Sequence, residues 1–198
     1  VGNIPTGGGG LPDARIALRQ PRNGAGMSGQ ADIGPMSYGG SRLALSTVRF
    51  AARPGGWAEV NTGALFDGPF SWGRVAGLRI PISGRFGSGG ALRFGERCLE
   101  AGFRSLTAGS LNLGPTRIPV CPTNGAILLK PAGGGLAVNA ATRNLRLRGR
   151  MGDSPFGLDA ATVRMRENRF DAGNVRTRMG RSEALVLVNA ERLQGSLE

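Results

Sequence analysis

The two cysteines are the residues whose chemistry is easiest to define. Cys98 and Cys121 are the only cysteines in the chain, and their spacing excludes the C-x-x-C pattern of redox and zinc sites. Both lie beside turn-forming residues, so the sequence predicts one disulfide, with two separate buried thiols as the alternative. In an oxidising compartment, closing a loop of about 24 residues stabilises a fold by roughly 3 kcal/mol.

Catalytic chemistry has few candidate residues. The chain has no histidine, which removes the commonest general base and metal ligand. The glycine run at residues 7–10 lacks the Gly-Lys-Ser/Thr ending of a P-loop, and no G-x-S-x-G sequence provides a nucleophile elbow. We therefore expect no catalytic residues, no metal site and no cofactor, and the protein is not expected to be an enzyme.

Alternation of apolar residues with arginines is the strongest pattern in the chain. It runs through residues 144–151 and recurs at 163–166, 175–179 and 192–197. Period-two alternation is typical of a β-strand with one apolar and one polar face. The residues predicted to share the apolar face are Leu145, Leu147, Met151, Val163, Met165, Val175 and Met179. The polar face is predicted to carry Arg146, Arg148, Arg164 and Arg166.

Upstream segments follow the same pattern with interruptions. Short alternating runs occur at residues 15–19, 78–83 and 92–94. Between Leu45 and Val48 the apolar phase slips by one residue, as a β-bulge would cause, and Pro81 indicates an edge or irregular position. Turn signals separate the runs at residues 54–56, 67–69, 87–90, 124–125, 133–135 and 152–155.

The spacing of these runs predicts the fold class. Short turns between strands favour antiparallel neighbours, because parallel neighbours need long crossover connections. The sequence therefore predicts an all-β fold, an antiparallel meander of about a dozen strands, and a sheet of that width must curl, close or stack. We expect residues 1–12 to form a linker or loop and residues 13–198 to form the β-rich segment.

Composition limits the classes of partner. The net charge is +12, and Lys130 is the only lysine among 25 basic residues. Such an excess attracts an anionic partner, either nucleic acid or an anionic lipid surface, although it also suits solvated strand faces. Aromatic residues make up only 6% and no compact basic block occurs, which argues against a nucleic-acid-binding module and leaves it as an alternative.

Targeting signals are missing from the sequence. No run approaches the roughly 18 apolar residues of a membrane span, so we expect no transmembrane segment. The chain opens Val-Gly-Asn-Ile-Pro, without an initiator methionine or a signal peptide. We therefore interpret it as an excised middle piece of a larger exported protein.

Two segments around the cysteines carry a family resemblance. They are FGERC at residues 94–98 and LNLGPTRIPVCP at 111–122, the latter followed by Gly125-Ala126. They resemble the central periplasmic region of YdbH-like proteins of the alphaproteobacterial type, within the AsmA-like family. Residues 67–69 and 78–86 are similar to the same region, and the resemblance covers residues 11–198.

The resemblance implies a fold and a function. AsmA-like proteins form a repeating β-groove, a taco-like sheet with an apolar inner surface, and a closed β-sandwich or solenoid is the alternative fold. The resemblance implies intermembrane phospholipid transport in the periplasm of a Gram-negative bacterium, by an envelope protein anchored in the inner membrane and active in outer membrane biogenesis.

The same resemblance implies roles for particular residues. The seven apolar-face residues would contact phospholipid acyl chains, and neighbouring β-groove segments of the same full-length protein would be partners. The disulfide Cys98–Cys121 would form in the oxidising periplasm. A structural or adhesive β-rich envelope protein without lipid cargo is the alternative function.

Overall fold

A computed structural model describes residues 2–8, 11–21 and 26–196 of the chain. Its regular elements are β-strands and one short 3₁₀ turn, η1 (Ser88–Gly90), so the all-β prediction is confirmed. No helix in these described residues has the length and apolar character that spanning a membrane requires.

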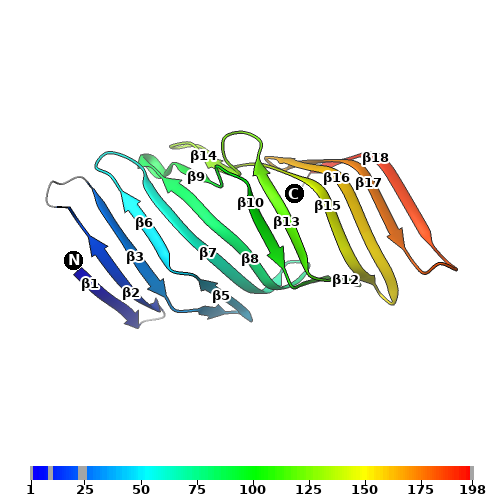
Figure 1. Cartoon of the computed structure of the whole chain (residues 1–198), viewed down its shortest axis with the longest axis horizontal. Coiled ribbons are helices and arrows are strands. Elements are labelled where there is room, and N and C mark those ends of the chain that lie inside the picture. The colour runs from blue at the N-terminus through cyan, green and yellow to red at the C-terminus, as the bar shows by residue number, and fades with distance from the viewer. Residues whose placement is uncertain (1, 9–10, 22–25, 197–198) are drawn as a thin grey trace.

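The strands form one antiparallel sheet of eighteen strands (Figure 1). The strands in its first half are β1 (Gly2–Gly8), β2 (Leu11–Arg19), β3 (Met27–Ile33), β4 (Met36–Tyr38), β5 (Ser41–Leu45), β6 (Val48–Ala52), β7 (Ala58–Phe70), β8 (Gly73–Phe86) and β9 (Leu92–Phe94). The second half contains β10 (Leu99–Phe103), β11 (Ser105–Ala108), β12 (Leu111–Leu113), β13 (Thr116–Pro122), β14 (Leu128–Lys130), β15 (Ala137–Met151), β16 (Ser154–Arg166), β17 (Arg169–Met179) and β18 (Val186–Ser196).

Most neighbours in the sheet are also neighbours along the chain. The long strands β7 and β8 pair with each other, and β15, β16, β17 and β18 pair in sequence order. Elsewhere a row consists of short strands placed end to end: β3 with β4, β5 with β6, β9 with β10 and β11, and β12 with β13 and β14. Grouped in this way, the eighteen strands make a twelve-row meander, in agreement with the predicted dozen.

The two faces of the sheet follow from the strand register. Residues opposite each other in an antiparallel pair point to the same side. Leu145 lies opposite Ala160, which lies opposite Val175. One residue further along, Arg146 lies opposite Asp159, which lies opposite Arg176. Leu145, Ala160 and Val175 lie on what we call the apolar face, and Arg146, Asp159 and Arg176 lie on what we call the polar face.

A line of irregular residues crosses strands β15 to β17. The ladder pairs residues on both sides of Asn144, Ala161 and Asn174 but not these three residues themselves. Asn144 and Asn174 have φ values of 53° and 51°, in the left-handed region that asparagine tolerates better than most residues. Strict alternation would put Leu145 and Val163 on opposite faces, but both pack against one cluster. The irregular line therefore keeps the apolar face continuous.

Burial in the sheet is shallow. The cluster contains Ala160, Ala172 and Val175, with Leu145, Leu158, Val163 and Ala190 packed against it. No large side chain among the described residues is fully buried. Because the residues in the cluster belong to neighbouring strands of the same sheet, the packing runs within one layer.

Three local predictions are tested by the strand register. The pairing shifts by one residue between β5 and β6, which confirms the bulge expected between Leu45 and Val48. Pro81 lies inside β8, opposite a break between β9 and β10, so it occupies an irregular position. Residues 67–69 were expected to form a turn and instead continue β7 through a bulge at Asp67.

Hydrogen bonding explains why residues 67–69 do not turn. Gly77 has a φ of 62°, and its N–H donates to Asp67 Oδ1 at 2.7 Å. Arg104 donates to the same oxygen at 3.1 Å. The carboxylate thus satisfies groups that the bulge leaves unpaired. The hydrogen bond from Gly77, followed by that from Arg104, lowers the pKa of Asp67.

The expectation of a linker or loop at residues 1–12 is also corrected. Residues 2–8 form β1, paired with β2, and β2 begins at Leu11. Residues 9–10 lie outside the described residues. Backbone pairing requires no particular side chains, so a glycine-rich segment can add to the unpaired edge of β2 without the apolar alternation that identifies a strand in a sequence.

Candidate functional site

All seven residues predicted to share the apolar face do so. Leu145, Leu147 and Met151 alternate along β15, and Val175 and Met179 join them through the register of β16 and β17. Val163 packs on the same cluster, and Met165 follows it by two residues. Val175 is buried and the other six are half-buried. Arg146, Arg148, Arg164 and Arg166 are exposed on the polar face, as predicted.

The apolar face is larger than the prediction. Leu158 lies opposite Leu147, and Phe156 lies opposite Met179. On the edge strand β18, Val186 and Val188 extend the same face and are 50% and 56% exposed. Phe156, Leu158 and Ala160 alternate with period two, so the same pattern in the sequence could have predicted that they lie on the apolar face.

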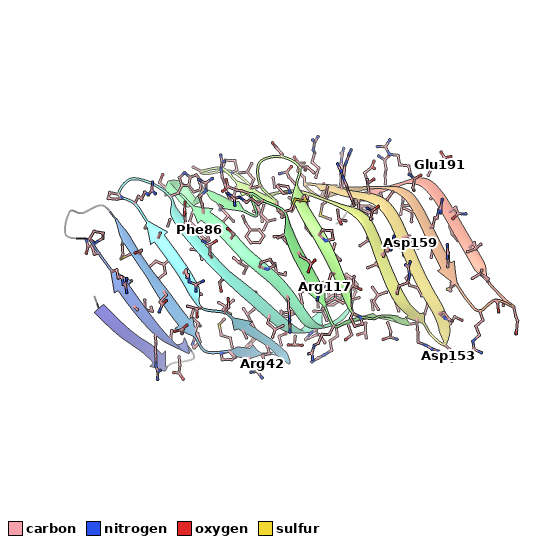
Figure 2. All side chains as sticks on the ribbon, in the orientation of Figure 1. Arg42, Phe86, Arg117, Asp153, Asp159 and Glu191 are labelled. Carbon is pink, nitrogen blue, oxygen red and sulfur yellow. A yellow bond between two sulfur atoms is a disulfide. The ribbon has the colours of Figure 1, made fainter. Side chains whose placement is uncertain are left out.

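The same face continues into the N-terminal half of the sheet. Leu78 lies opposite Phe66, and Ile80 lies opposite Ala64. On the polar side, Arg79 lies opposite Gly102, which lies opposite Arg117. The register through β10, β13 and β15 therefore joins the two halves into one apolar face and one polar face. Figure 2 shows the side chains on both halves of the sheet.

Ion pairs are distributed along the polar face. Asp159, labelled in Figure 2, lies between Arg146 and Arg176 in the register and accepts a hydrogen bond from Arg148 at 2.6 Å. Arg117 lies 3.7 Å from Glu100. Like charges on adjacent strands repel, so these carboxylates reduce the repulsion between arginines. Exposed pairs of this kind contribute little to stability individually.

Glu96 and Arg85 form the best-aligned ion pair. Arg85 Nε donates to Glu96 Oε2 at 2.8 Å, and Arg85 Nη2 donates to Oε1 at 2.5 Å. The hydrogen bonds from Arg85 are the main cause that lowers the pKa of the Glu96 carboxyl. Hydrogen bonds from Arg192 and Gln194 likewise lower the pKa of Asp171.

These lowered pKa values predict an acid-sensitive fold. A carboxyl whose folded pKa lies below its unfolded pKa stabilises the protein above the unfolded value, near 4, and that stability is lost as pH falls through the folded pKa. The urea midpoint should therefore stay level between pH 7 and 5 and decline below about pH 4. Glu96→Gln should make the decline shallower, whereas Glu191→Gln on the exposed part of β18 should leave it unchanged. An equally steep decline for Glu96→Gln would contradict this role.

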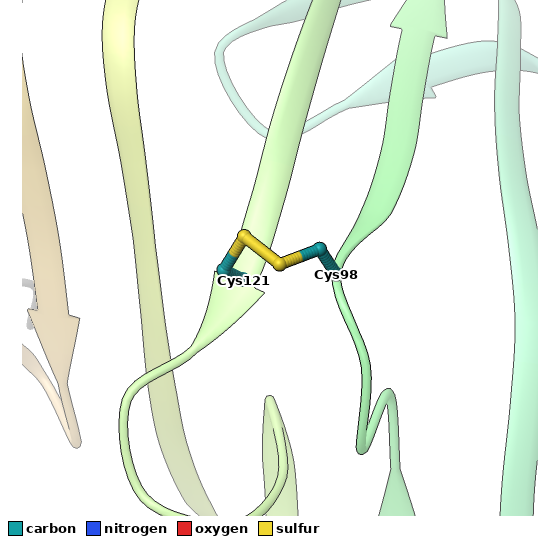
Figure 3. Close-up of a disulfide and its surroundings, with 2 residues drawn as sticks. All are labelled: Cys98 and Cys121. Carbon is teal, nitrogen blue, oxygen red and sulfur yellow. A yellow bond between two sulfur atoms is a disulfide. The ribbon is translucent and has the colours of Figure 1, made fainter.

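The disulfide between Cys98 and Cys121 is present, as predicted (Figure 3). Leu99 of β10 lies opposite Val120 of β13. Cys98 directly precedes Leu99 and Cys121 directly follows Val120, so the two cysteines are the next residues along these two segments. Cys121 also lies opposite Ala141, which lies opposite Arg164, and this places the disulfide on the polar face. Their Cα atoms are 4.0 Å apart.

The disulfide lies where the sheet is least regular. Residues 95–98 interrupt the row between β9 and β10, and residues 123–127 interrupt the next row between β13 and β14. Measured against β8, the register shifts by three residues across the first interruption. Measured against β15, it shifts by four residues across the second. The covalent bond therefore holds two strands together beside a break in their hydrogen bonding.

Hollows open on the polar face at these irregular places. One of about 760 Å³ borders the interruption after β9 and is lined mainly by polar and charged residues, together with Pro81, Cys98 and Leu99. Another of about 320 Å³ lies beside Cys121 and Arg143. A third, of about 1120 Å³, lies at the ends of β16, β17 and β18. Of the seven predicted apolar-face residues, Met165 lines this third hollow.

No group of histidine, cysteine, aspartate or glutamate residues in the described part of the chain could hold a metal ion. Comparison of the chain with protein-family models, curated proteins and solved structures finds no match. The inference of function therefore depends on the two faces of the sheet and on the residues that line them.

Proposed function

We propose that this chain is a β-groove segment of an AsmA-like envelope protein that shields phospholipid acyl chains during transport between two membranes. The observation that supports the proposal is a continuous apolar face on a single sheet, with side chains that stay half-exposed. Its occupants would be acyl chains, and its protein partners would be neighbouring segments of the same protein. No reaction step is part of this function.

The energetics of acyl chains favour such a surface. Each methylene removed from water contributes about 0.8 kcal/mol, so a sixteen-carbon chain exposed to water costs on the order of 12 kcal/mol. An apolar face that contacts the chain removes most of that cost without specific hydrogen bonds. Met165 and Met179 suit this role because methionine side chains adapt to a variable partner.

The proposal includes a compartment. The disulfide Cys98–Cys121 supports an oxidising location, because disulfides persist in the periplasm and are rare in the cytosol. We place the protein in the periplasm of a Gram-negative bacterium, as part of a protein anchored in the inner membrane. Mass spectrometry of the non-reduced protein from periplasmic extracts should find no alkylatable thiol.

Photo-crosslinking in cells tests contact with lipid. A photoreactive side chain at Leu147 or Leu158, which lie opposite each other on the apolar face, should capture phospholipid. The matched positions Arg148 and Arg178 lie on the polar face and should capture little. Equal capture at both pairs of positions would contradict the proposal.

A charge on the apolar face tests transport. Leu147→Asp places an ionised carboxylate against hydrocarbon, which costs several kcal/mol unless the group takes up a proton. The variant should keep its β-sheet circular dichroism and lose lipid capture at Leu158, and Arg148→Asp is the control. Unfolding of Leu147→Asp would show a packed core and favour the structural or adhesive alternative.

A further inference from the structure

The hollow of about 1120 Å³ at the ends of β16, β17 and β18 has an unusual charge balance. Its lining includes four arginines, Arg164, Arg166, Arg169 and Arg192, and two carboxylates, Glu167 and Asp171. The lining also includes Gln194, Ser196 and Thr123, which add hydrogen-bonding groups from two other parts of the chain. The hollow therefore carries a net positive charge.

One of the two carboxylates already has its partners. Asp171 Oδ2 accepts hydrogen bonds from Arg192 Nε at 2.7 Å and from Gln194 Nε2 at 2.8 Å. These interactions hold the Asp171 side chain on the β18 side of the hollow. Asp171 therefore forms no ion pair with Arg166 or Arg169, the two arginines nearest the β16–β17 hairpin.

Those two arginines oppose each other directly. Arg166 and Arg169 flank the β16–β17 turn and are partners in the strand register. Both are exposed, and no ion pair joins either one to a carboxylate among the described residues. Like charges directly opposite on antiparallel strands are destabilising. An anion bound between the two guanidinium groups would relieve this repulsion.

The chemistry of the anion follows from the donors. Guanidinium groups bind phosphate oxygens through paired hydrogen bonds, which are stronger than neutral ones. In the register, Arg166 lies opposite Asn139 and Arg169 lies opposite Ser196. Hydrogen-bonding residues thus stand on both sides of the arginine pair, which suits an anion with several oxygens.

Apolar residues complete the lining. Met165 and Phe170 are the next opposed pair in the β16–β17 register and also line the hollow. They belong to the apolar face, so apolar residues lie directly beside the charged residues of the hollow at this end of the sheet. A ligand with a phosphate group and an acyl chain would find a partner for each part.

We propose that this hollow binds the phosphate group of an anionic phospholipid between Arg166 and Arg169. The arginine pair by itself supports the binding of a phosphate group. The inference that this phosphate belongs to a lipid rests on the function proposed above. The site would set the preference of the apolar face for anionic over zwitterionic lipids.

Calorimetry with soluble probes tests the site. The probes are monomeric dihexanoylphosphatidylglycerol, dihexanoylphosphatidylcholine and glycerol 3-phosphate. Wild-type protein should bind the phosphatidylglycerol more tightly than the phosphatidylcholine. Arg166→Gln/Arg169→Gln should weaken phosphatidylglycerol binding by at least about tenfold, because two charge-assisted hydrogen bonds are lost. Arg146→Gln/Arg176→Gln removes the same charge from the same face, outside this hollow, and should change binding by less than about twofold.

Thermal unfolding separates binding from structure. Without lipid, Arg166→Gln/Arg169→Gln should be at least as stable as wild type, because it removes a repulsive pair. Loss of binding together with retained or increased stability is the result that a purely structural role would not produce. A large loss of stability in this variant would overturn the proposal.

The remaining outcomes distinguish failure of the phosphate site from failure of the proposed lipid-shielding function. If both double variants weaken phosphatidylglycerol binding equally, the binding depends on the general positive charge of the polar face and the proposed site is wrong. If a single-stranded oligonucleotide binds more tightly than phosphatidylglycerol, the site is overturned in favour of nucleic-acid binding. Phosphatidylglycerol binding that survives Arg166→Gln/Arg169→Gln but is lost in Leu147→Asp would remove this site and keep the proposed function. Glycerol 3-phosphate bound as tightly as phosphatidylglycerol, and released by Arg166→Gln/Arg169→Gln, would support the phosphate site and contradict acyl-chain binding.

Discussion

Replacement of both Cys98 and Cys121 by serine is expected to lower the free energy of unfolding by about 3 kcal/mol, from the chain entropy that the crosslink removes from the unfolded state. The cysteines are 23 positions apart in sequence. The loss should be concentrated in β10 and β13, because the rows on both sides of the disulfide are interrupted. Urea denaturation measures the total, and hydrogen exchange of the β10 and β13 amides measures its location.

Reduction provides the matched control for this prediction. Dithiothreitol should lower the urea midpoint of the wild-type protein to that of the Cys98→Ser/Cys121→Ser variant and leave the variant unchanged. Protection that falls uniformly across the sheet, or not at all in β10 and β13, would show that the disulfide does not stabilise the interrupted rows.

Gly149→Ala should destabilise the protein by roughly 1–3 kcal/mol, the usual range for an added group in a packed site. A Cβ atom at Gly149 would overlap the backbone carbonyl of Asn112 and lie 2.8 Å from the Cα atom of Leu113. These are backbone atoms of the neighbouring strand β12, which cannot rotate away as a side chain can. The strands β12 and β15 would have to separate.

Gly157→Ala is the control for that substitution. Gly157 lies one strand away, and a Cβ atom there would meet the Arg148 side chain at 3.6 Å, an ordinary contact. The change should alter the free energy of unfolding by no more than about 0.5 kcal/mol. Similar losses for both variants, measured in urea, would mean that glycine is needed at these positions for a reason other than close packing of strands.

Much of the fold could be predicted from alternation alone. Apolar and charged residues with period two predicted the strands β15 to β18 and the face to which their side chains point. The phase slip between Leu45 and Val48 predicted a bulge that the register contains. These predictions are reliable because successive side chains of a strand point to opposite faces of the sheet, so a residue's position in the sequence determines its face.

Other features leave weak or misleading signals in the sequence. The left-handed conformations of Asn144 and Asn174 restore the apolar face, but nothing distinguishes these asparagines from others in the chain. Asp67-Gly68-Pro69 has the composition of a turn, yet tertiary hydrogen bonds to Asp67 keep it within β7. Local composition does not contain information about partners on neighbouring strands.

The hollow at the ends of β16 to β18 illustrates the same limit. Thr123 and Ser196 line it together although they are far apart in sequence. A tight hairpin predicts that Arg166 and Arg169 lie opposite each other. The hollow that they line can be seen only once the rows from β13 to β18 are placed side by side. Sequence reasoning placed Arg164 and Arg166 on a polar face and missed that these two line one hollow with Arg169 and Arg192.

The meander topology has a consequence for cooperativity. Each row contacts chiefly the rows before and after it in sequence, so the stability is close to a sum of terms for adjacent rows, as in repeat proteins. Heat or urea would then melt the molecule by fraying inward from β1 and β18, and different probes would report different midpoints. Such a sheet can gain or lose a terminal hairpin while the remaining rows stay folded, which makes its length, unlike that of a closed globular core, easy for evolution to adjust.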